Sequence, residues 1–250
     1  MQREDIYAAF LRVITAGRGV AWRVDDSMTL RLDPRCRWIR DPNYEKPVVS
    51  YLRSKVQPGD VCIDVGAHVG FYVLQFAAWT APSGHVVAFE PNPTARAVLE
   101  SNLALNHMTS RVTVERTAVG EKAGIAELFH STDTSGLSRL AAPNPEGAAG
   151  HSIQVPVTTL DAYCEAHAIR PSWLLVDVEG AELSVLKGAA ALIRNTPINV
   201  VVEMHPSLWD DQSRDGKFEA FVHSCGRRAV GVTNQRHALQ DYGTIALVQA

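Results

Sequence analysis

The sequence lacks several features that mark specialised classes of protein. No apolar run approaches the roughly 20 residues that a membrane-spanning helix needs, and residues 1–5 have no signal-peptide-like apolar stretch. The 24 Lys and Arg do not outnumber the 27 Asp and Glu, so the formal charge is −3. Such a chain has no global attraction to nucleic acid or to an anionic membrane. We therefore expect neither a nucleic-acid partner nor a membrane.

Cysteine is scarce and scattered. The four cysteines, Cys36, Cys62, Cys164 and Cys225, form no C-x-x-C pair and no close cluster. This spacing argues against a zinc site, and a disulfide framework is unusual in a chain of 250 residues. We expect a reducing, cytoplasmic location.

The composition that remains is that of an ordinary globular protein, with 46% hydrophobic and 20% charged residues. It excludes disordered, collagen-like and low-complexity classes. The length favours one large domain, or one domain with a small cap, over two equal domains.

From residue 47 onward, short apolar runs alternate with segments of helical periodicity. Strands are expected at 61–65, 85–90, 111–115, 173–178 and 198–202, with a closing β pair at 228–232 and 244–248. Helices are expected at 71–79, 94–106, 161–167, 181–193 and 218–225. Repeated β-α units whose strands are apolar on both faces predict a mainly parallel sheet with helices on both sides.

Two segments differ from this pattern. Residues 1–46 suggest an N-terminal β cap built on a hairpin, so the main domain is expected to span 47–250. An inserted β extension is expected at about 125–157, with antiparallel strands near its two ends. Its middle, 141–150, is rich in Ala, Pro and Gly and is either a connector or a substrate-closing lid.

The main chemical motif lies between the strand at 61–65 and the helix at 71–79. Asp64, Gly66 and Gly70 form the pattern D-x-G-x-x-x-G. A dinucleotide fingerprint would need G-x-G-x-x-G, and His68 occupies its second glycine position. Glycines at a strand end let a ligand approach the backbone, so this spacing favours a nucleoside without phosphates.

A second carboxylate ends the next strand. Glu90 follows the apolar run 85–89, and a carboxylate there can accept hydrogen bonds from both hydroxyls of a ribose. S-adenosylmethionine fits both features, because it has a ribose diol, an ammonium and a carboxylate but no phosphate.

At these positions the sequence resembles the FkbM-type methyltransferases. The matching segments are Tyr44–Pro47, Pro58–Tyr72, Phe89–Pro93, Asn102–Asn106, Asp177–Glu182 and Leu186–Ala189. The resemblance covers roughly residues 44–206, and the D-V-E-G-A-E block at 177–182 is its most specific element. It implies a Rossmann-like class I methyltransferase fold, with a mainly parallel seven-stranded sheet, and methyl transfer from S-adenosylmethionine to a hydroxyl of a sugar or secondary metabolite.

The resemblance also implies which residues bind the cofactor. They are Asp64, Gly66, Ala67, His68, Gly70, Glu90, Pro91, Asn92, Ala118, Val119 and Asp177. Within this set, Glu90 would hold the ribose, Ala118 and Val119 would border the adenine, and Asp177 would face the methionine end or the acceptor.

Methyl transfer to oxygen also needs a group that removes the acceptor proton. His205, Asp177 and Glu179 are the catalytic candidates at the ends of the fourth and fifth strands, and imidazole needs little retuning to act as a base near neutral pH. Structural roles remain open, because Glu179 and Glu182 could serve the first turn of a helix and His205 could be a surface residue. A divalent cation held by Asp177, Glu203 and His205 is a further alternative.

We therefore predict a S-adenosylmethionine-dependent O-methyltransferase acting on a small sugar-like or natural-product acceptor. N-methylation, carboxyl methylation and a catalytically silent S-adenosylmethionine-binding module are the alternatives, and a homo-oligomer is left open.

Overall fold

The computed structural model describes residues 11, 13, 15, 17–24, 28–41, 43–130, 138–140, 151–210, 213 and 216–250. The predicted loop at 141–150 lies outside these residues. None of the helices described is both long and apolar enough to cross a membrane.

The central element is a seven-stranded sheet in the order β12-β13-β11-β10-β3-β4-β5. Its strands are β3 (Val61–Val65), β4 (His85–Phe89), β5 (Val112–Glu115), β10 (Trp173–Val176), β11 (Asn199–Met204), β12 (Arg227–Gly231) and β13 (Gly243–Gln249). Neighbours from β5 to β11 pair in parallel, whereas β13 runs antiparallel to β11 and to β12. The predicted mainly parallel sheet and its closing β pair are confirmed.

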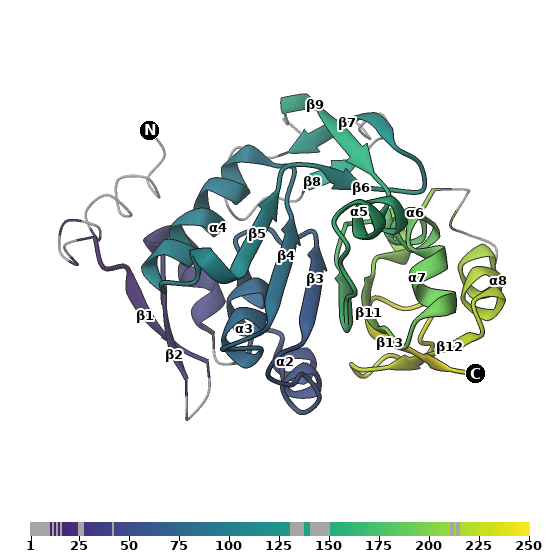
Figure 1. The fold of residues 1–250 in the computed structure, drawn as a ribbon, viewed down its shortest axis with the longest axis horizontal. Helices are drawn as coiled ribbons and strands as arrows, with labels where there is room; N and C mark the ends of the chain where they lie inside the picture. The colour runs from purple at the N-terminus through teal and green to yellow at the C-terminus, as the bar shows by residue number, and fades with distance from the viewer. Residues whose placement is uncertain are drawn as a thin grey trace.

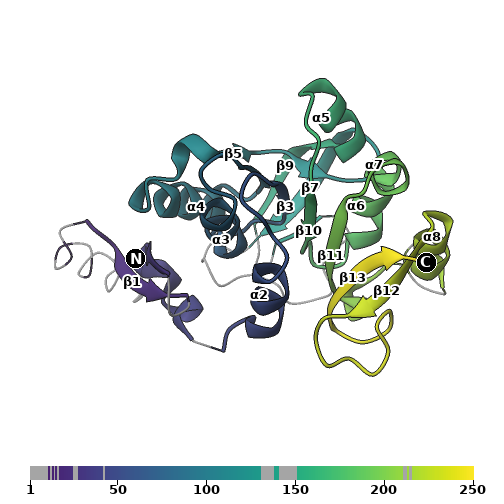
Figure 2. The same ribbon diagram turned by 60° about the horizontal axis from the view of Figure 1, so that its bottom comes forward.

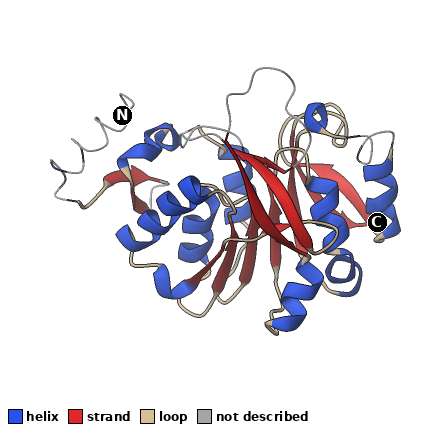
Figure 3. Cartoon of the chain, turned by 90° about the horizontal axis from the view of Figure 1, so that it is seen from above, coloured by secondary structure: helices blue, strands red, loops and turns tan. Residues whose placement is uncertain are grey.

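Helices cover both faces of this sheet (Figures 1 and 3). On one face lie α2 (Lys46–Arg53), α3 (Phe71–Trp79) and α4 (Pro93–Leu105), and on the other lie α5 (Leu160–Ala166), α6 (Glu182–Gly188), α7 (Ala190–Asn195) and α8 (Lys217–Ser224). The strand residues alternate between the two buried layers, because successive side chains of a strand point to opposite faces. Cys62 joins the core under α3, for example, and Ile63 joins the core under α6.

The helix predicted at 181–193 is divided into α6 and α7. At the division, Gly188 packs so closely on the backbone of Gly120 that a Cβ would lie 2.1 Å from the Gly120 carbonyl oxygen. The periodicity of the apolar residues continues across this point, so the sequence pattern alone did not reveal the break.

A second, four-stranded sheet has the order β6-β9-β7-β8. Its strands are β6 (Ala118–Val119), β7 (Gly124–His130), β8 (Ser138–Leu140) and β9 (His151–Thr158). The antiparallel pairing of β7 with β9 is the one predicted for the inserted segment. Figure 1 shows this sheet above the ends of β4 and β5.

The N-terminal hairpin pairs β1 (Val20–Arg23) with β2 (Thr29–Leu32). Asn106, at the end of α4, accepts a hydrogen bond from the Arg31 amide and donates one to the Arg31 carbonyl. The hairpin therefore lies against α4, at the opposite end of the molecule from β12 and β13 (Figure 2).

Candidate functional site

The carboxyl ends of β4, β3, β10 and β11 bring polar residues onto one level. Val65 pairs with Phe89 on one side and with Val176 on the other, and Val176 pairs with Val202. The residues one step further along these strands are Glu90, Gly66, Asp177 and Glu203. Because paired residues project from the same face of a sheet, the three carboxylates share one side of this edge.

Gly66 lies between these carboxylates, next to Asp177. Its φ is +87°, and a Cβ there would lie 1.8 Å from the Asp177 carbonyl oxygen. Gly70 has a φ of +90°, and its Cβ would lie 2.4 Å from Leu99 Cδ1. Close packing and backbone conformation therefore require glycine at both positions. Because Gly66 has no side chain, the sheet edge is bare between β3 and β10, which is the switch point where the strand order reverses. In open α/β sheets, ligands bind at such switch points.

Asp64 and Glu90 are both buried, with exposed fractions of 2% and 4%. Glu90 is anchored by backbone amides: His68 N donates to Oε2 at 2.7 Å and Asn92 N donates to Oε1 at 2.8 Å. Asp64 is not anchored in this way, since its Oδ2 has no hydrogen-bond partner among the residues described. Such a buried orphan acceptor is costly and points to a ligand.

The two carboxyls influence each other. Burial raises the pKa of Asp64 to about 8, and the negative charge of Glu90 adds to the shift. Burial also raises the pKa of Glu90, to about 7, although its bonds from the amides of Asn92 and His68 favour the charged form. Since Glu90 has these two donors and Asp64 Oδ2 has none among the residues described, Asp64 keeps its proton to a higher pH than Glu90 does.

The other expected cofactor residues lie in the loops around this pair. Ala67 N donates to the Phe89 carbonyl at 3.1 Å, and His68 has a left-handed backbone with a φ of +49°. Asn92 caps α4, because its side chain accepts from Thr94 N, and the Pro91 carbonyl accepts from Arg96. These contacts hold the two loops around the Glu90 carboxylate.

Ala118 and Val119 form β6 and are buried, with 3% and 2% exposure. Their side chains pack against protein: Ala118 with Leu128 and Val155, and Val119 in the core under α6.

On the other side of Gly66, His205 lies among carboxylates. Its Nε2 is 3.3 Å from Glu179 Oε2, 3.8 Å from Glu203 Oε1 and 3.9 Å from Asp177 Oδ1. The structure thus brings together the four residues that the sequence proposed as catalytic or metal-binding. Asp177, Glu203 and His205 each offer one ligand atom, and these atoms lie within 4.8 Å of one another. This donor set could hold a divalent cation.

The other ring nitrogen of His205 faces Glu182, which lies at the start of α6. Nδ1 is 2.8 Å from Glu182 Oε1, and the opposite oxygen of Glu182 accepts from the Trp209 indole at 2.8 Å. Glu182 also accepts from the Gly180 amide at 2.9 Å and is fully buried.

Charge crowding shifts the ionisation of this group. Burial raises the pKa of Asp177 well above its usual range, and the charges of Glu203, Glu179 and Asp64 raise it further. For His205, burial lowers the pKa, but the hydrogen bond to Glu182 and the charges of Glu179, Glu182 and Glu203 outweigh it, so the net shift is upward. The cluster therefore favours a proton, a cation or a hydroxyl donor at its centre.

A further wall of the site was missed by the sequence reasoning. Glu45 accepts a hydrogen bond from the Tyr72 hydroxyl at 3.1 Å, and its pKa is raised by burial and by the charge of Glu203. The Tyr242 hydroxyl donates to Glu203, and its ring lies 5.5 Å from that of His205. The motif at 44–47 was a signal for Glu45, whereas nothing in the sequence indicated that Tyr242 lies beside β11.

Glu45 and Glu179 share an unusual backbone. Both have a φ of +52°, a left-handed conformation that is uncommon for residues other than glycine. Such strain concentrates at functional sites.

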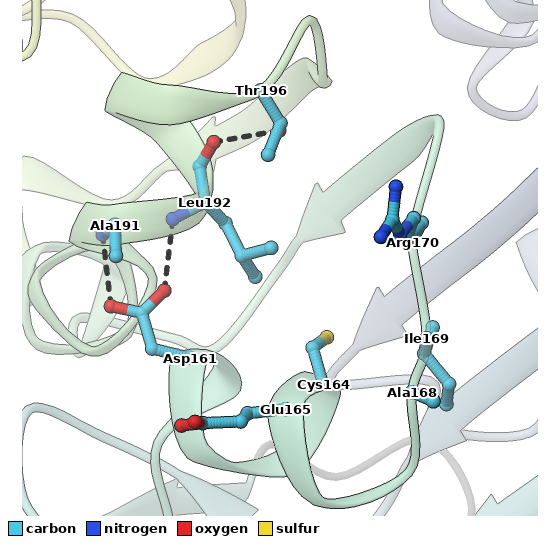
Figure 4. Close-up of a pocket in the computed structure, with 9 residues that line it drawn as sticks. All are labelled: Asp161, Cys164, Glu165, Ala168, Ile169, Arg170, Ala191, Leu192 and Thr196. Atoms are coloured by element: carbon cyan, nitrogen blue, oxygen red, sulfur yellow. Dashed lines mark hydrogen bonds between the residues drawn. The ribbon is translucent and has the colours of Figure 1, made fainter.

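A separate cleft lies on the opposite face, between α5 and α7 (Figure 4). Two carboxylates line it, Asp161 and Glu165, and Asp161 accepts hydrogen bonds from the amides of Ala191 and Leu192 at the start of α7. The cleft also contains the thiol of Cys164, and burial raises the pKa of this thiol to about 11. Because Asp161 caps a helix and Cys164 stays protonated near neutral pH, this cleft does not carry the chemistry described above.

Comparison with known proteins identifies the family. The model of the methyltransferase FkbM domain matches residues 64–229. The 31-O-demethyl-FK506 methyltransferase FkbM of Streptomyces tacrolimicus is 29% identical in an alignment 187 residues long, and the match covers 62% of this chain and 70% of that protein. The hexuronic acid methyltransferase AglP of Haloferax volcanii is 27% identical, over 68% of this chain and 66% of that protein.

A solved structure agrees with the fold. The methyltransferase FkbM from Methylobacillus flagellatus KT superposes with a TM-score of 0.51 at 19% sequence identity. The match covers 76% of this chain but 43% of that one, so this chain spans less than half of its length. The fold is that of the class I methyltransferases, as predicted, and the chain belongs to the FkbM methyltransferase family.

Proposed function

We propose that this protein transfers a methyl group from S-adenosylmethionine to a hydroxyl of a sugar-like or natural-product acceptor. The observation that carries the proposal is the arrangement of residues at the carboxyl ends of the strands. There Glu90 and Asp177 flank the bare backbone of Gly66, and His205 lies beside Asp177. Two relatives, named as FK506 and hexuronic acid methyltransferases, support an acceptor of this class.

The cofactor half of the proposed site is built on β3 and β4. Glu90 would accept hydrogen bonds from the ribose hydroxyls, since each of its oxygens has a lone pair beyond the amide bond that it accepts. Asp64 would find in the cofactor the partner that its buried Oδ2 lacks among the described residues. Ala67, His68, Gly70, Pro91 and Asn92 would form the enclosing loops. At Ala118 and Val119, contact with the adenine would come from the backbone, because their side chains are buried in protein.

Bound S-adenosylmethionine supplies a methyl group on a sulfonium, and the electron pair of the broken C–S bond stays on sulfur. The acceptor oxygen forms the new bond to carbon and loses its proton. His205 Nε2 would take that proton, and Asp177 and Glu179 would accept hydrogen bonds from the acceptor and stabilise the imidazolium that forms. Holding oxygen and methyl in line contributes up to about 7–11 kcal/mol in favourable cases.

Two exposed tyrosines beside the carboxylates, Tyr44 and Tyr242, support a sugar-like acceptor. Tyr242 is 66% exposed although its hydroxyl donates to Glu203, and Tyr44 is 36% exposed and packs edge-on against Phe71. Exposed rings beside a group of carboxylates suit a molecule with apolar C–H faces and many hydroxyl donors.

A divalent cation is the second candidate for the same centre. Asp177, Glu203 and His205 would hold it, and it would lower the pKa of the acceptor hydroxyl. The buried hydrogen bond between His205 Nδ1 and Glu182 favours a metal, because metal-bound histidines usually donate the N–H of their second ring nitrogen to a carboxylate. Dialysis against EDTA followed by Mg²⁺ or Mn²⁺ addition distinguishes the two: metal-free turnover supports His205 as the base.

The test of the proposed function is mass spectrometry of an acceptor panel after incubation with S-adenosylmethionine. The panel contains sugars and polyketides with free hydroxyls, and matched amines and carboxylic acids. Methylation of hydroxyl compounds is expected. Transfer only to amines or carboxylates would show N-methylation or carboxyl methylation in place of methylation of hydroxyls. Cofactor binding without transfer to any member of the panel would indicate a silent module.

A further inference from the structure

We propose that Glu182 is a positioning residue that fixes the tautomer of His205, with the proton on Nδ1 and the lone pair of Nε2 on the side of Glu179, Glu203 and Asp177. This role rests on the proposed function in one respect only: it gives His205 Nε2 the form that can accept a proton or bind a cation. Its evidence is the geometry of the buried carboxylate itself.

The surroundings of Glu182 consist of donors. Oε1 lies 2.9 Å from the Gly180 amide and 2.8 Å from His205 Nδ1, and Oε2 lies 2.8 Å from the Trp209 indole nitrogen. The amide and the indole can only donate. A fully buried ionised carboxylate can only accept, and it needs such partners to offset the cost of its burial.

The consequence for His205 follows from the same bookkeeping of donors and acceptors. An imidazole nitrogen 2.8 Å from a carboxylate oxygen must carry the hydrogen. Once Nδ1 carries it, the neutral ring has its lone pair on Nε2. That atom faces Asp177, Glu179 and Glu203, which is the side where β10 and β11 end.

Trp209 has a part in this arrangement that simple helix capping does not explain. Glu182 could cap the first turn of α6 through Gly180 alone. Instead, Trp209 donates to the second oxygen and is itself fixed by stacking on Phe218, with ring centroids 5.2 Å apart. The carboxylate is thus held from both sides and cannot rotate away from His205.

The experiment is ¹⁵N NMR of the histidine rings in the full chain without an acceptor, at a pH high enough for His205 to be neutral. Native His205 should show a protonated Nδ1 and an unprotonated Nε2. His167 is the internal reference, because its Nδ1 lies 2.9 Å from the Tyr163 carbonyl and must donate to it. A His205→Gln spectrum assigns the signals.

Glu182→Gln breaks the arrangement in a defined way. In one orientation the new amide oxygen accepts from Gly180 and His205, and the amide NH₂ then faces the Trp209 N–H, which is also a donor. In the reverse orientation the amide NH₂ faces the Gly180 N–H, which is again a donor, and His205 Nδ1 must accept. Both orientations leave one donor unsatisfied, so both tautomers of His205 should appear. Adding Trp209→Phe removes the indole N–H that faces the amide NH₂ in the first orientation. The double variant should therefore show only the Nδ1–H tautomer.

The outcomes separate the proposal from its competitors. Trp209→Phe alone should keep the native tautomer, and Glu165→Gln, at an exposed position of α5, is the control for a Glu-to-Gln change elsewhere. A native His205 with its proton on Nε2, an unchanged tautomer in Glu182→Gln, or a double variant that fails to restore the native tautomer would each overturn the positioning role. Circular dichroism and thermal melting show whether each variant keeps its fold, independently of cofactor binding. A correct tautomer in a chain that methylates no hydroxyl would contradict the proposed function and leave the role of Glu182 intact.

Discussion

The two halves of the site are built in different ways. On the β3–β4 side, the Glu90 carboxylate is held by backbone amides from two adjacent loops. On the β10–β11 side, carboxylates face one another and one imidazole, and their partners come from segments as distant as Glu45 and Tyr242. The first half is therefore preformed by local chain geometry, whereas the second depends on tertiary packing and carries unbalanced charge.

This contrast predicts different failures. Damage to the β3–β4 half should weaken cofactor binding, and damage to the β10–β11 half should slow transfer while binding persists. The variants below are ordered from the largest expected effect to the smallest.

His205→Ala should give the largest effect. Removing the proposed base is expected to lower kcat by about 100- to 10,000-fold. Binding of S-adenosylhomocysteine, measured by calorimetry, should change little, because His205 lies on the β10–β11 side. A variant that transfers methyl at the native rate would show that another group accepts the proton.

Glu90→Ala should act on the other half. Loss of the proposed ribose acceptor should weaken S-adenosylhomocysteine binding by about 1–3 kcal/mol, which is about 5- to 150-fold in Kd. The matched control is Glu100→Ala, at an exposed position on α4, the helix that follows Glu90. This variant should bind normally. An unchanged Kd in Glu90→Ala would contradict the ribose assignment.

Asn102→Ala tests what supports the β3–β4 half. Asn102 is buried, donates to the Val69 carbonyl at 2.8 Å and accepts from the Asp33 amide at 2.7 Å, so it ties the glycine loop to the N-terminal region. We expect a loss of about 1–3 kcal/mol in the free energy of unfolding, measured by chemical denaturation. Asn199→Ala, which removes an exposed side chain with one bond to Ser172, should cost much less. Equal losses would show that the Asn102 bridge is not a special support.

Asp64→Asn should have an effect of opposite sign on stability. The pKa of Asp64 rises to about 8 in the folded protein, from about 3.9 in an unfolded chain, so folding favours its protonated form. The stability that this proton contributes is complete below pH 4 and is lost as the pH rises to about 8. The ligand-free variant, which is always neutral, should therefore melt higher than the native protein at pH 8 and have a flatter pH dependence. A native protein that melts higher than the variant at pH 8 would contradict this ionisation.

The same contrast explains what the sequence could predict. Asp64, Gly66, Gly70 and Glu90 lie in short motifs at strand ends, and the parallel register puts adjacent ends together. The division of the predicted helix at Gly188 was not predictable, because it depends on close packing against Gly120 from another segment. Glu182 was visible as a first-turn carboxylate, but its bond to His205 depends on how β11 and α6 pack. Tyr242 reaches Glu203 only because β13 runs antiparallel to β11.

The most direct measurement is a crystal structure of the protein with S-adenosylhomocysteine bound. Both ribose hydroxyls should lie within hydrogen-bond distance of Glu90, and the sulfur should point over Gly66 toward Asp177 and His205. A nucleoside bound in another cleft, or a ribose with no contact to Glu90, would contradict it.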